Sequence, residues 1–258
     1  MAFKTNLDTW YWNPNIISQE NNPCLHDENY ALIVLNHGLD DLNTKQVNHF
    51  DRLWNSAKFR LSVDGGTNNL IDLGDSYIPD CISGDFDSIK ESTLNHFKKL
   101  KVEIIKTIDQ DHIDFMKSLF ILSEKINSKI LKIDYIIVIW QITHRIDQTF
   151  ANISALYKWY RMVNQCPIFL LDIKGSLSWL LPKGNHEIIS NKVSNWCSLV
   201  PFAGDTRISS SGLMYNMDKL ILSFNVILST SNKLDKSMDK VTLQVDDKPV
   251  LWSQELLV

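Results

Sequence analysis

The stretch Ile82-Ser83-Gly84-Asp85-Phe86-Asp87-Ser88-Ile89 places two carboxylates one residue apart, directly after a short apolar run and a glycine. We expect an extended segment that ends at Gly84, followed by a loop in which Asp85 and Asp87 point the same way. A hard cation such as Mg²⁺ prefers oxygen ligands and keeps waters and substrate phosphates in its remaining positions. The stretch is therefore a candidate cation site. The alternative is an Asx-rich turn in which Asp87 caps the following helix.

Units of strand, loop and helix repeat on both sides of this stretch. A continuous apolar run, typical of a strand buried on both faces of a parallel sheet, predicts a strand at 31–35. Further strands are predicted at 59–63, 81–83, 102–105, 133–139 and 167–171. Helices are expected near 46–57, 66–73 and 91–99, and in segments that reach about 125 and 160. This alternation predicts an α/β domain over 30–172, with a mostly parallel sheet, flanking helices and a ligand site beyond the carboxyl ends of the strands.

Beyond residue 172 the helical periodicity stops, and short alternating segments separated by Gly, Pro, Asn or Ser replace it. Strands are predicted at 176–181, 186–189, 196–201, 206–210, 220–223, 225–228, 241–245 and 250–253. So many short strands predict an all-β sandwich, jelly-roll-like, over 173–258. Residues 1–29 are polar and rich in Asn, and we expect them to form an N-terminal arm lying over the body.

Composition narrows the class of protein. The chain has 258 residues, of which 44% are hydrophobic and 22% charged, as is ordinary for a globular protein with a substantial core. A net charge of −4 provides no broad basic field, so nucleic acid is not an expected partner. Four scattered cysteines and an opening without an apolar signal core favour a cytoplasmic protein. No apolar run approaches the ~20 residues needed to span a bilayer, so no membrane partner is expected.

Acidic residues recur in the loops that follow the predicted strands. Asp85, Asp87, Asp111, Asp114 and Asp147 come from three such loops, and the parallel sheet would bring these loops to one edge. We therefore predict a shared metal and phosphate site there. For Asp109 and Asp114 the alternative role is capping or first-turn stabilisation of a helix.

Basic and amide side chains beside these acids have two interpretations each. Arg145 is placed to bind a phosphate through two nitrogens, or to pair with Asp147. His112 and His144 are more typical of structural than of catalytic histidines. Gln110 is a candidate for reading a substrate amine or ring nitrogen, or for capping a turn.

The common nucleotide-binding motifs are absent from the sequence. Neither G-x-x-x-x-G-K-[ST] nor G-x-G-x-x-G occurs, so a nucleoside triphosphate site here would be unconventional. The turn Asp64-Gly65-Gly66 lies between a predicted strand and a predicted helix. In that geometry exposed backbone N–H groups and a helix N-terminus face a phosphate.

Taken together, five motifs resemble the thiamin pyrophosphokinase family, in order and in spacing. They are Asp64-Gly65-Gly66-Thr67-Asn68, Gly84-Asp85-Phe86-Asp87-Ser88-Ile89, Asp109-Gln110-Asp111-His112-x-Asp114-Phe115, Arg145-x-Asp147-Gln148 and Ser229-Thr230-Ser231-Asn232. The resemblance runs from about Leu32 to Trp252. It implies an α/β domain followed by a β-sandwich, and a homodimer with active sites at the subunit interface. The implied reaction transfers pyrophosphate from ATP to the hydroxyethyl group of thiamin and releases AMP.

The resemblance also implies roles for individual residues. Mg²⁺ would be held through Asp85, Asp87 and Asp114. The implied catalytic set is Asp85, Asp87, Asp111, Asp114, Arg145 and Asp147, with Arg145 and Asp147 facing the triphosphate. The implied binding set for ATP and thiamin is Asp64, Gly65, Gly66, Asn68, Gln110, His112, Gln148, Ser229, Thr230, Ser231 and Asn232.

One segment departs from the family pattern. Where the family has a glycine pair and a further glycine before Arg-x-Asp, this chain reads Trp140-Gln141-Ile142-Thr143-His144-Arg145. Glycines permit close approach to phosphate, and Trp140 or His144 would narrow that space. We predict an active site with an altered phosphate cradle. Two alternatives are a thiamin-binding relative with impaired catalysis and another Mg²⁺-dependent phosphohydrolase acting on nucleotides.

Overall fold

The computed structural model describes residues 2–4, 9–18, 25, 27–143, 145–163, 166–190 and 194–256. The chain forms two compact units. Residues 26–174 form the α/β unit, and residues 1–25 together with 175–258 form the β unit. Among the described helices none is both long and apolar enough to cross a membrane.

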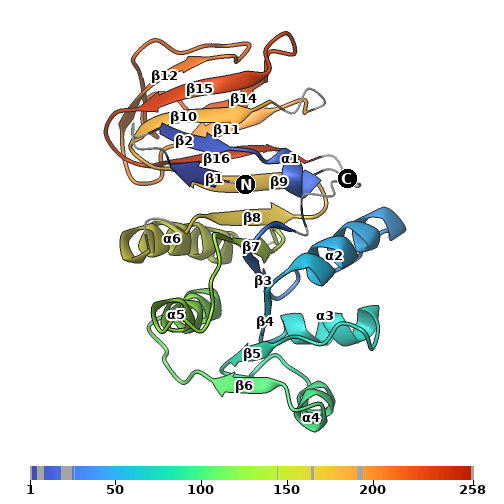
Figure 1. Cartoon of the computed structure of the whole chain (residues 1–258). Coiled ribbons are helices and arrows are strands. Elements are labelled where there is room, and N and C mark those ends of the chain that lie inside the picture. Colours follow the sequence, from blue (N-terminus) through green and yellow to red (C-terminus); the bar gives the residue numbers. More distant parts are fainter. Residues whose placement is uncertain are drawn as a thin grey trace. The chain divides into compact units, whose positions relative to one another are not determined.

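The α/β unit is built on six described strands that follow one another in a sheet, and every neighbouring pair among them is parallel. Its strands are β3 (Tyr30–Val34), β4 (Phe59–Val63), β5 (Cys81–Gly84), β6 (Glu103–Lys106), β7 (Tyr135–Ile139) and β8 (Ile168–Asp172), in the order β8-β7-β3-β4-β5-β6. Its helices are α2 (Thr44–Ser56), α3 (Gly66–Leu73), α4 (Glu91–Lys99), α5 (Asp114–Asn127) and α6 (Ile146–Met162). In Figure 1, α2, α3 and α4 lie on one side of this sheet and α5 and α6 on the other.

The centre of the sheet explains where a ligand can bind. Every residue of β3 and β7 is buried, as the continuous apolar runs predict. From β3 the strand order continues to β4 on one side and to β7 on the other. Such a reversal opens a crevice beyond the carboxyl ends of the strands. The loops after β3, β4, β5 and β7 therefore converge on one place.

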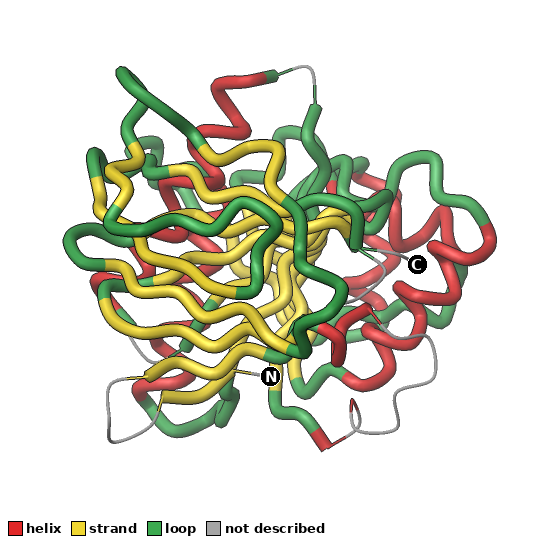
Figure 2. Tube along the Cα trace, turned by 90° about the horizontal axis from the view of Figure 1, so that it is seen from above, coloured by secondary structure: helices red, strands yellow, loops and turns green. Residues whose placement is uncertain are grey.

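The β unit consists of two sheets. One has the order β1-β2-β10-β15-β12-β13, and β14, β11, β16 and β9 follow one another in the second. The bounds are β1 (Ala2–Lys4), β2 (Thr9–Trp12), β9 (Ser176–Leu181), β10 (Gly184–Ile189), β11 (Cys197–Val200), β12 (Thr206–Ser211), β13 (Leu220–Leu222), β14 (Ser229–Asn232), β15 (Lys240–Val245) and β16 (Val250–Glu255), with a short helix α1 (Asn15–Ser18). Figure 2 shows strands of this unit running side by side.

Tryptophans join the two sheets of the β unit through its core. The rings of Trp12 on β2 and Trp179 on β9 have centroids 5.9 Å apart, and Trp179 contacts Trp252 on β16 at 6.0 Å. All three side chains are buried. Burying such large rings between two sheets stabilises a sandwich. The prediction of an α/β fold followed by a β-sandwich is confirmed.

Two segments of the β unit differ from the sequence-based expectation. Within the expected arm 1–29, β2 pairs in parallel with β10 and β1 pairs with β2, so these residues extend a sheet. The strand predicted at 225–228 is wrong. The backbone turns there, with Val226 N–H donating to Ser223 O and Asn225 N–H donating to Ser223 Oγ. Ser and Asn satisfy turns in this way, and the strand begins later, as β14.

A buried histidine makes the stability of the β unit depend on pH. Trp12 Nε1–H donates to His186 Nδ1 at 3.0 Å, and His186 Nε2 lies 2.7 Å from Pro182 O, so the ring fits only as the neutral form. Burial lowers the pKa of His186 to about 4, although the Pro182 carbonyl acts in the opposite direction. Between this value and the ordinary pKa of about 6.5, the unfolded chain binds a proton that the folded chain does not.

We therefore expect stability to fall as pH falls from about 6.5 to 4, by roughly 3 kcal/mol from His186. His49 on α2 acts in the same direction, because burial lowers its pKa to about 3. Urea unfolding between pH 7.5 and 4.5 measures the effect. A His186→Phe variant should show a flatter profile, whereas His96→Gln, at a partly exposed position on α4, should follow the wild-type profile. Parallel profiles for wild type and His186→Phe would contradict the assignment.

Candidate active site

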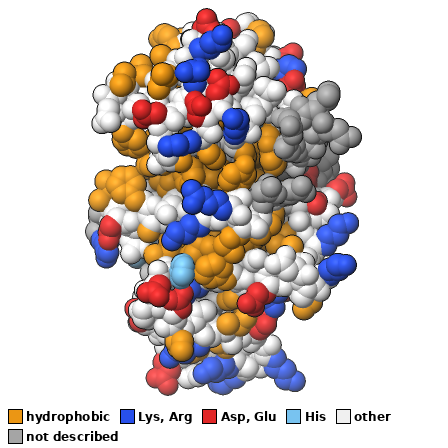
Figure 3. Space-filling model, turned by 90° about the vertical axis from the view of Figure 1, so that its left-hand side faces the viewer, with side chains coloured by type: hydrophobic (Ala, Val, Ile, Leu, Met, Phe, Trp, Pro, Cys, Tyr) orange, Lys and Arg blue, Asp and Glu red, His pale blue; other side chains and the backbone are white. Residues whose placement is uncertain are grey.

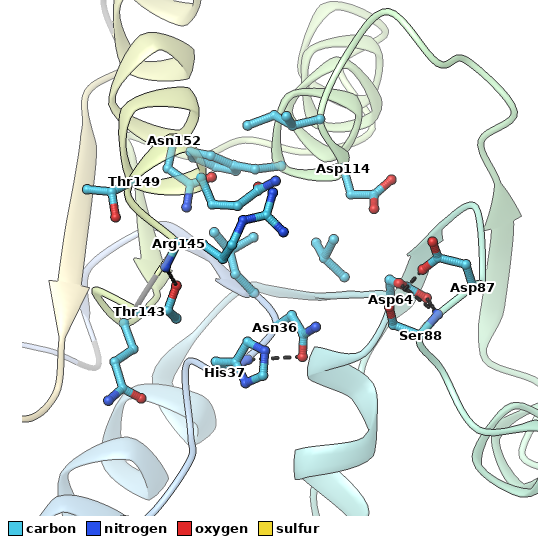
Figure 4. A pocket seen from close by; sticks show the side chains of 16 residues that line it. Asn36, His37, Asp64, Asp87, Ser88, Asp114, Thr143, Arg145, Thr149 and Asn152 are labelled. Atoms are coloured by element: carbon cyan, nitrogen blue, oxygen red, sulfur yellow. Dashed lines mark hydrogen bonds between the residues drawn. The ribbon is translucent and has the colours of Figure 1, made fainter.

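A pocket of about 460 Å³ opens at the carboxyl ends of the parallel strands (Figure 4). It is lined by Leu35, Asn36, His37, Val63, Asp64, Asp87, Ser88, Ile113, Asp114, Phe115, Gln141, Thr143, Arg145, Gln148, Thr149 and Asn152. Acidic side chains lie on one side of the pocket, where Figure 4 shows Asp64, Asp87 and Ser88 together. Arg145 lies on the other side. The pocket lies where the strand order predicts it.

Three carboxylates gather at one edge of this pocket, which Asp64 and Asp87 line and Asp85 does not among the described residues. One ligand oxygen each of Asp64, Asp85 and Asp87 lies within 4.8 Å of the others, and Asp64 is buried. Asp64 accepts hydrogen bonds from the backbone N–H of Ser88 at 3.2 Å and of Ile89 at 3.1 Å. Burial, followed by the neighbouring Asp87 carboxyl, raises the pKa of Asp64 above its usual range. Acids held this close repel one another, so this edge suits a divalent cation.

The loop after β5 is shaped by its backbone as well as by its acids. Phe86 has a positive φ of 69°, and Asp87 N–H donates to Asp85 Oδ1 at 3.3 Å, so the loop turns back on itself. Asn68 on α3 holds the C-terminal end of this loop, because its side chain donates to Ser88 O and accepts from Lys90 N–H, both at 3.0 Å. Asn68 therefore supports the acid loop from behind.

Two glycines at the start of α3 allow its backbone to pack closely against a neighbouring loop. A Cβ on Gly65 would lie 2.7 Å from Asn36 Oδ1, and one on Gly66 would lie 2.8 Å from the Leu35 carbonyl carbon. These two glycines bring the start of α3 against the loop that follows β3. In the part of the chain that the structure describes, Gly65, Gly66 and Asn68 do not line the pocket, although Asp64 does.

Gly84 is the position where a methyl group should do most harm. Its φ is +149°, and a Cβ there would lie 2.8 Å from the Asp64 Cβ. We expect Gly84→Ala to cost about 2–4 kcal/mol of unfolding free energy, from the unfavourable backbone conformation and the displaced Asp64. Urea denaturation measures this loss. Gly74→Ala is the matched control, because φ there is +142° but its Cβ would meet nothing within 4 Å. Equal losses in both variants would contradict the proposed clash with Asp64.

Of the loop from Asp109 to Asp114, only the last two residues, Ile113 and Asp114, line the pocket among the described residues. Asp109 accepts from Asp111 N–H at 2.8 Å and pairs with His112 Nδ1 at 2.7 Å, and these contacts lower its pKa. Asp114, the first residue of α5, lines the pocket and pairs with the buried Lys117 at 2.6 Å. Within the described structure Gln110, Asp111 and His112 do not line it.

Arg145 and Asp147 form an ion pair, which is the second of the two interpretations that the sequence allowed for Arg145. The distances are 2.8 Å from Nε to Oδ1 and 2.5 Å between the second nitrogen and Oδ2, and both side chains are exposed. The guanidinium lowers the pKa of Asp147 to about 2. Arg145 and Gln148 line the pocket, and Asp147 does not among the residues described. Because exposed pairs are weak, Arg145 can exchange this partner for a phosphate.

The segment that departs from the family pattern has a specific structure. Trp140 is buried and is not one of the described residues that line the pocket, so it does not narrow that space. Gln141 and Thr143 line it instead. The Gln141 amide fits with its nitrogen donating to His37 O at 2.9 Å and its oxygen accepting from Lys174 Nζ at 3.0 Å. His144 lies outside the described residues.

A second pocket lies in the β unit. It is lined by Tyr215, Asn216, Met217, Leu220, Leu222, Ile227, Leu228, Ser229, Thr230, Ser231 and Asn232. The last four are the residues of β14. Asn232 is held by Tyr215, because its side chain donates to Tyr215 O at 2.9 Å and accepts from Tyr215 N–H at 3.2 Å. Hydroxyl and amide groups thus stand beside apolar side chains, as in many small-molecule sites.

Several pocket residues were not singled out from the sequence. They are Asn36, His37, Ser88, Thr143, Thr149 and Asn152. Asn36 and His37 directly follow the apolar run of β3, so the rule that located the acidic loops applies to them too. They carry no carboxylate and match none of the motifs sought. Thr149 and Asn152 lie on α6, three residues apart and on one face.

The fold and the pocket together indicate a class of enzyme. A parallel α/β unit with acids and an arginine around a polar pocket, joined in one chain to a β-sandwich, is the organisation of an enzyme that handles phosphate groups. Sequence comparison identifies the family: the pattern of the thiamin pyrophosphokinase catalytic domain matches residues 50–170, and that of its vitamin B1 binding domain matches residues 185–250. The chain belongs to the thiamin pyrophosphokinase family, the transferases that make thiamine diphosphate.

Individual relatives support the same family assignment. Thiamin pyrophosphokinase 1 of Caenorhabditis elegans is 30% identical over 195 residues, which are 74% of this chain and 77% of the relative. Thiamine pyrophosphokinase 1 of Arabidopsis thaliana is 30% identical over 243 residues, 87% and 85% of the two chains. The solved thiamin pyrophosphokinase from Candida albicans has the same fold, with a TM-score of 0.80 at 21% identity over 95% of this chain and 92% of that one. The resemblance seen in the sequence is confirmed.

Proposed function

We propose that this protein transfers the pyrophosphoryl group of ATP to the hydroxyl of thiamin, giving thiamin diphosphate and AMP. The observation that carries the proposal is the pocket at the ends of β3, β4, β5 and β7, which sets clustered carboxylates opposite Arg145 in a chain of this family. Phosphoryl transfer needs an aligned phosphate chain with its charge neutralised, and this pocket has groups of both kinds.

A divalent cation fits the acidic edge of the pocket. Asp64, Asp85 and Asp87 offer oxygen ligands at suitable separation. The pKa of Asp64 is raised by its burial first and by the neighbouring Asp87 carboxyl second, and a cation would relieve the second effect. We propose that these three residues hold Mg²⁺, with Asp114 as a further ligand from α5. Bound Mg²⁺ would supply charge neutralisation to the phosphates. We also propose that Asp111, which follows β6 but does not line the pocket among the described residues, acts through the position of Asp114.

The remaining residues bind and orient the substrates in this proposal. Arg145 leaves Asp147 to contact the phosphates, and Gln148 lies beside it on α6. Thiamin binds in the pocket of the β unit, where Ser229, Ser231 and Asn232 offer polar contacts. The match of residues 185–250 to a vitamin B1 binding domain supports this assignment. Gln110 and His112 are proposed to contact thiamin from the other side of the active site.

We further propose a homodimer, with thiamin held between subunits. Exposed apolar side chains support it: Met214, Tyr215, Leu220, Ile221, Phe224, Val226 and Ile227 cluster in sequence around the pocket of the β unit. Figure 3 shows that apolar side chains reach the surface on one face of the molecule. A subunit interface would remove this apolar surface from water. Free, buried Cys81, Cys166 and Cys197 are consistent with the proposed cytoplasmic location.

The direct test is product formation. Purified protein with ATP, thiamin and Mg²⁺ should yield thiamin diphosphate and AMP in equal amounts, and a chelator should stop both. Calorimetry that shows thiamin binding without ATP binding or turnover would instead indicate a binding relative. Phosphate release from ATP with no need for thiamin would indicate a phosphohydrolase. Either of these results overturns the proposal.

A further inference from the structure

His37 is held in the pocket by its backbone as well as by its ring. It follows β3 in a left-handed conformation with a φ of 62°, which is uncommon for a residue other than glycine. Its N–H donates to Asn36 Oδ1 at 3.1 Å, and its carbonyl oxygen accepts from the Gln141 amide at 2.9 Å. Backbone strain that is fixed in this way at a ligand pocket is a mark of function.

The ring of His37 is oriented by a carboxylate that is itself held. His37 Nδ1 lies 2.7 Å from Asp40 Oδ2, and Asn69 on α3 donates to Asp40 Oδ1 at 2.8 Å. With Nδ1 committed to Asp40, Nε2 is the ring nitrogen available to a ligand.

The charges of the pocket decide what this ring binds. His37 and Arg145 are the basic side chains among its described lining residues, against the acids Asp64, Asp87 and Asp114. A nucleoside triphosphate would bring several negative charges into that surrounding, without a Walker lysine to meet them. A second oriented hydrogen-bond donor beside Arg145 would help to bind these phosphates. The other charged groups near His37 are Asp40 on its own loop and Lys174 behind Gln141.

We propose that His37 is a phosphate-binding residue, whose Nε2–H donates to a phosphate oxygen of the nucleotide while Asp40 and Gln141 fix its position. The inference rests on the proposed function, because it assumes that this pocket takes the nucleotide. It also accounts for the departure from the family glycines: Gln141 supplies a side chain that holds the His37 loop, so the phosphate-binding loops of this chain include the His37 side chain.

Calorimetric titration with α,β-methylene ATP and Mg²⁺ tests the proposal at pH 6. His37→Asn is the suitable variant, because asparagine tolerates a positive φ but lacks the imidazole Nε2–H. We expect about tenfold weaker binding than wild type, because the oriented donor to the phosphate is lost. His96→Gln, on α4 and outside the pocket, is the matched control and should bind as wild type does.

A double-mutant cycle tests the clamp. Gln141→Ala should weaken binding by a smaller factor, and adding it to His37→Asn should cost nothing further, because its effect passes through His37. Equal affinity of wild type and His37→Asn at pH 6, or fully additive losses, would overturn the inference. Protein that binds the analogue through His37 but makes no thiamin diphosphate would overturn the proposed function and leave this inference standing.

Discussion

Replacing Asp87 by asparagine should reduce the rate of thiamin diphosphate formation by at least about a thousandfold and leave the fold intact. Asp87 lines the pocket and belongs to the cluster with Asp64 and Asp85. Its loss removes a proposed Mg²⁺ ligand and the charge that a cation would balance. Stability should stay the same or rise slightly, because Asp64 loses a like-charged neighbour that raises its pKa.

Two measurements on one preparation separate the metal role from a structural role. Turnover at saturating ATP, thiamin and Mg²⁺ should be lost, while the thermal midpoint stays within a few degrees of wild type. Asp75→Asn is the control, because Asp75 is exposed after α3 and is not a described residue of the pocket. A wild-type rate of the Asp87→Asn variant at saturating Mg²⁺ would contradict the assignment of Asp87 as a metal ligand. A large fall in thermal stability would instead point to a structural Asp87.

The sequence predicted the sheet because apolar segments, continuous in β3 and β7, alternate with helical ones, but it did not predict which acids gather. The proposed ligands were Asp85, Asp87 and Asp114, whereas the cluster in the structure joins the first two to Asp64. The reason is strand order. β4 and β5 are neighbours with Val63 opposite Ser83, so the residues that follow them are adjacent. Asp114 instead begins a helix that follows the edge strand β6. Adjacency of strands is a tertiary property that spacing along the chain does not contain.

His37 was missed for a different reason. Asn36, His37 and Gly38 carry no carboxylate and match none of the motifs sought, so their chemistry appears only once β3 is seen beside β7. Gly38 shows the same dependence, because a Cβ there would lie 2.7 Å from the carbonyl oxygen of Ile139 on β7. The strands at the N-terminus were missed because β2 pairs with β10, more than 170 residues away in sequence.

Replacing Lys117 by methionine should lower both stability and activity, for one electrostatic reason. Lys117 is only 5% exposed, and its Nζ lies 2.6 Å from Asp114 Oδ1 and 3.1 Å from Asp109 O. It therefore ties the two ends of the acidic loop together and holds Asp114 in the pocket. Methionine fills similar space but leaves Asp114 without its partner, which should cost about 2 kcal/mol, with about a hundredfold loss of turnover.

Lys125→Met is the matched control, because Lys125 lies on the same helix and also pairs with a carboxylate, Glu103, at 2.8 Å. That pair is at the surface, so its loss should cost less than about 1 kcal/mol and leave turnover unchanged. The double variant Lys117→Met with Asp114→Asn removes both charges of the pair. It should regain much of the lost stability, because no unpaired carboxylate remains, but it should stay inactive. If Lys117 served the fold alone, Lys117→Met would be destabilised yet turn over normally below its unfolding temperature.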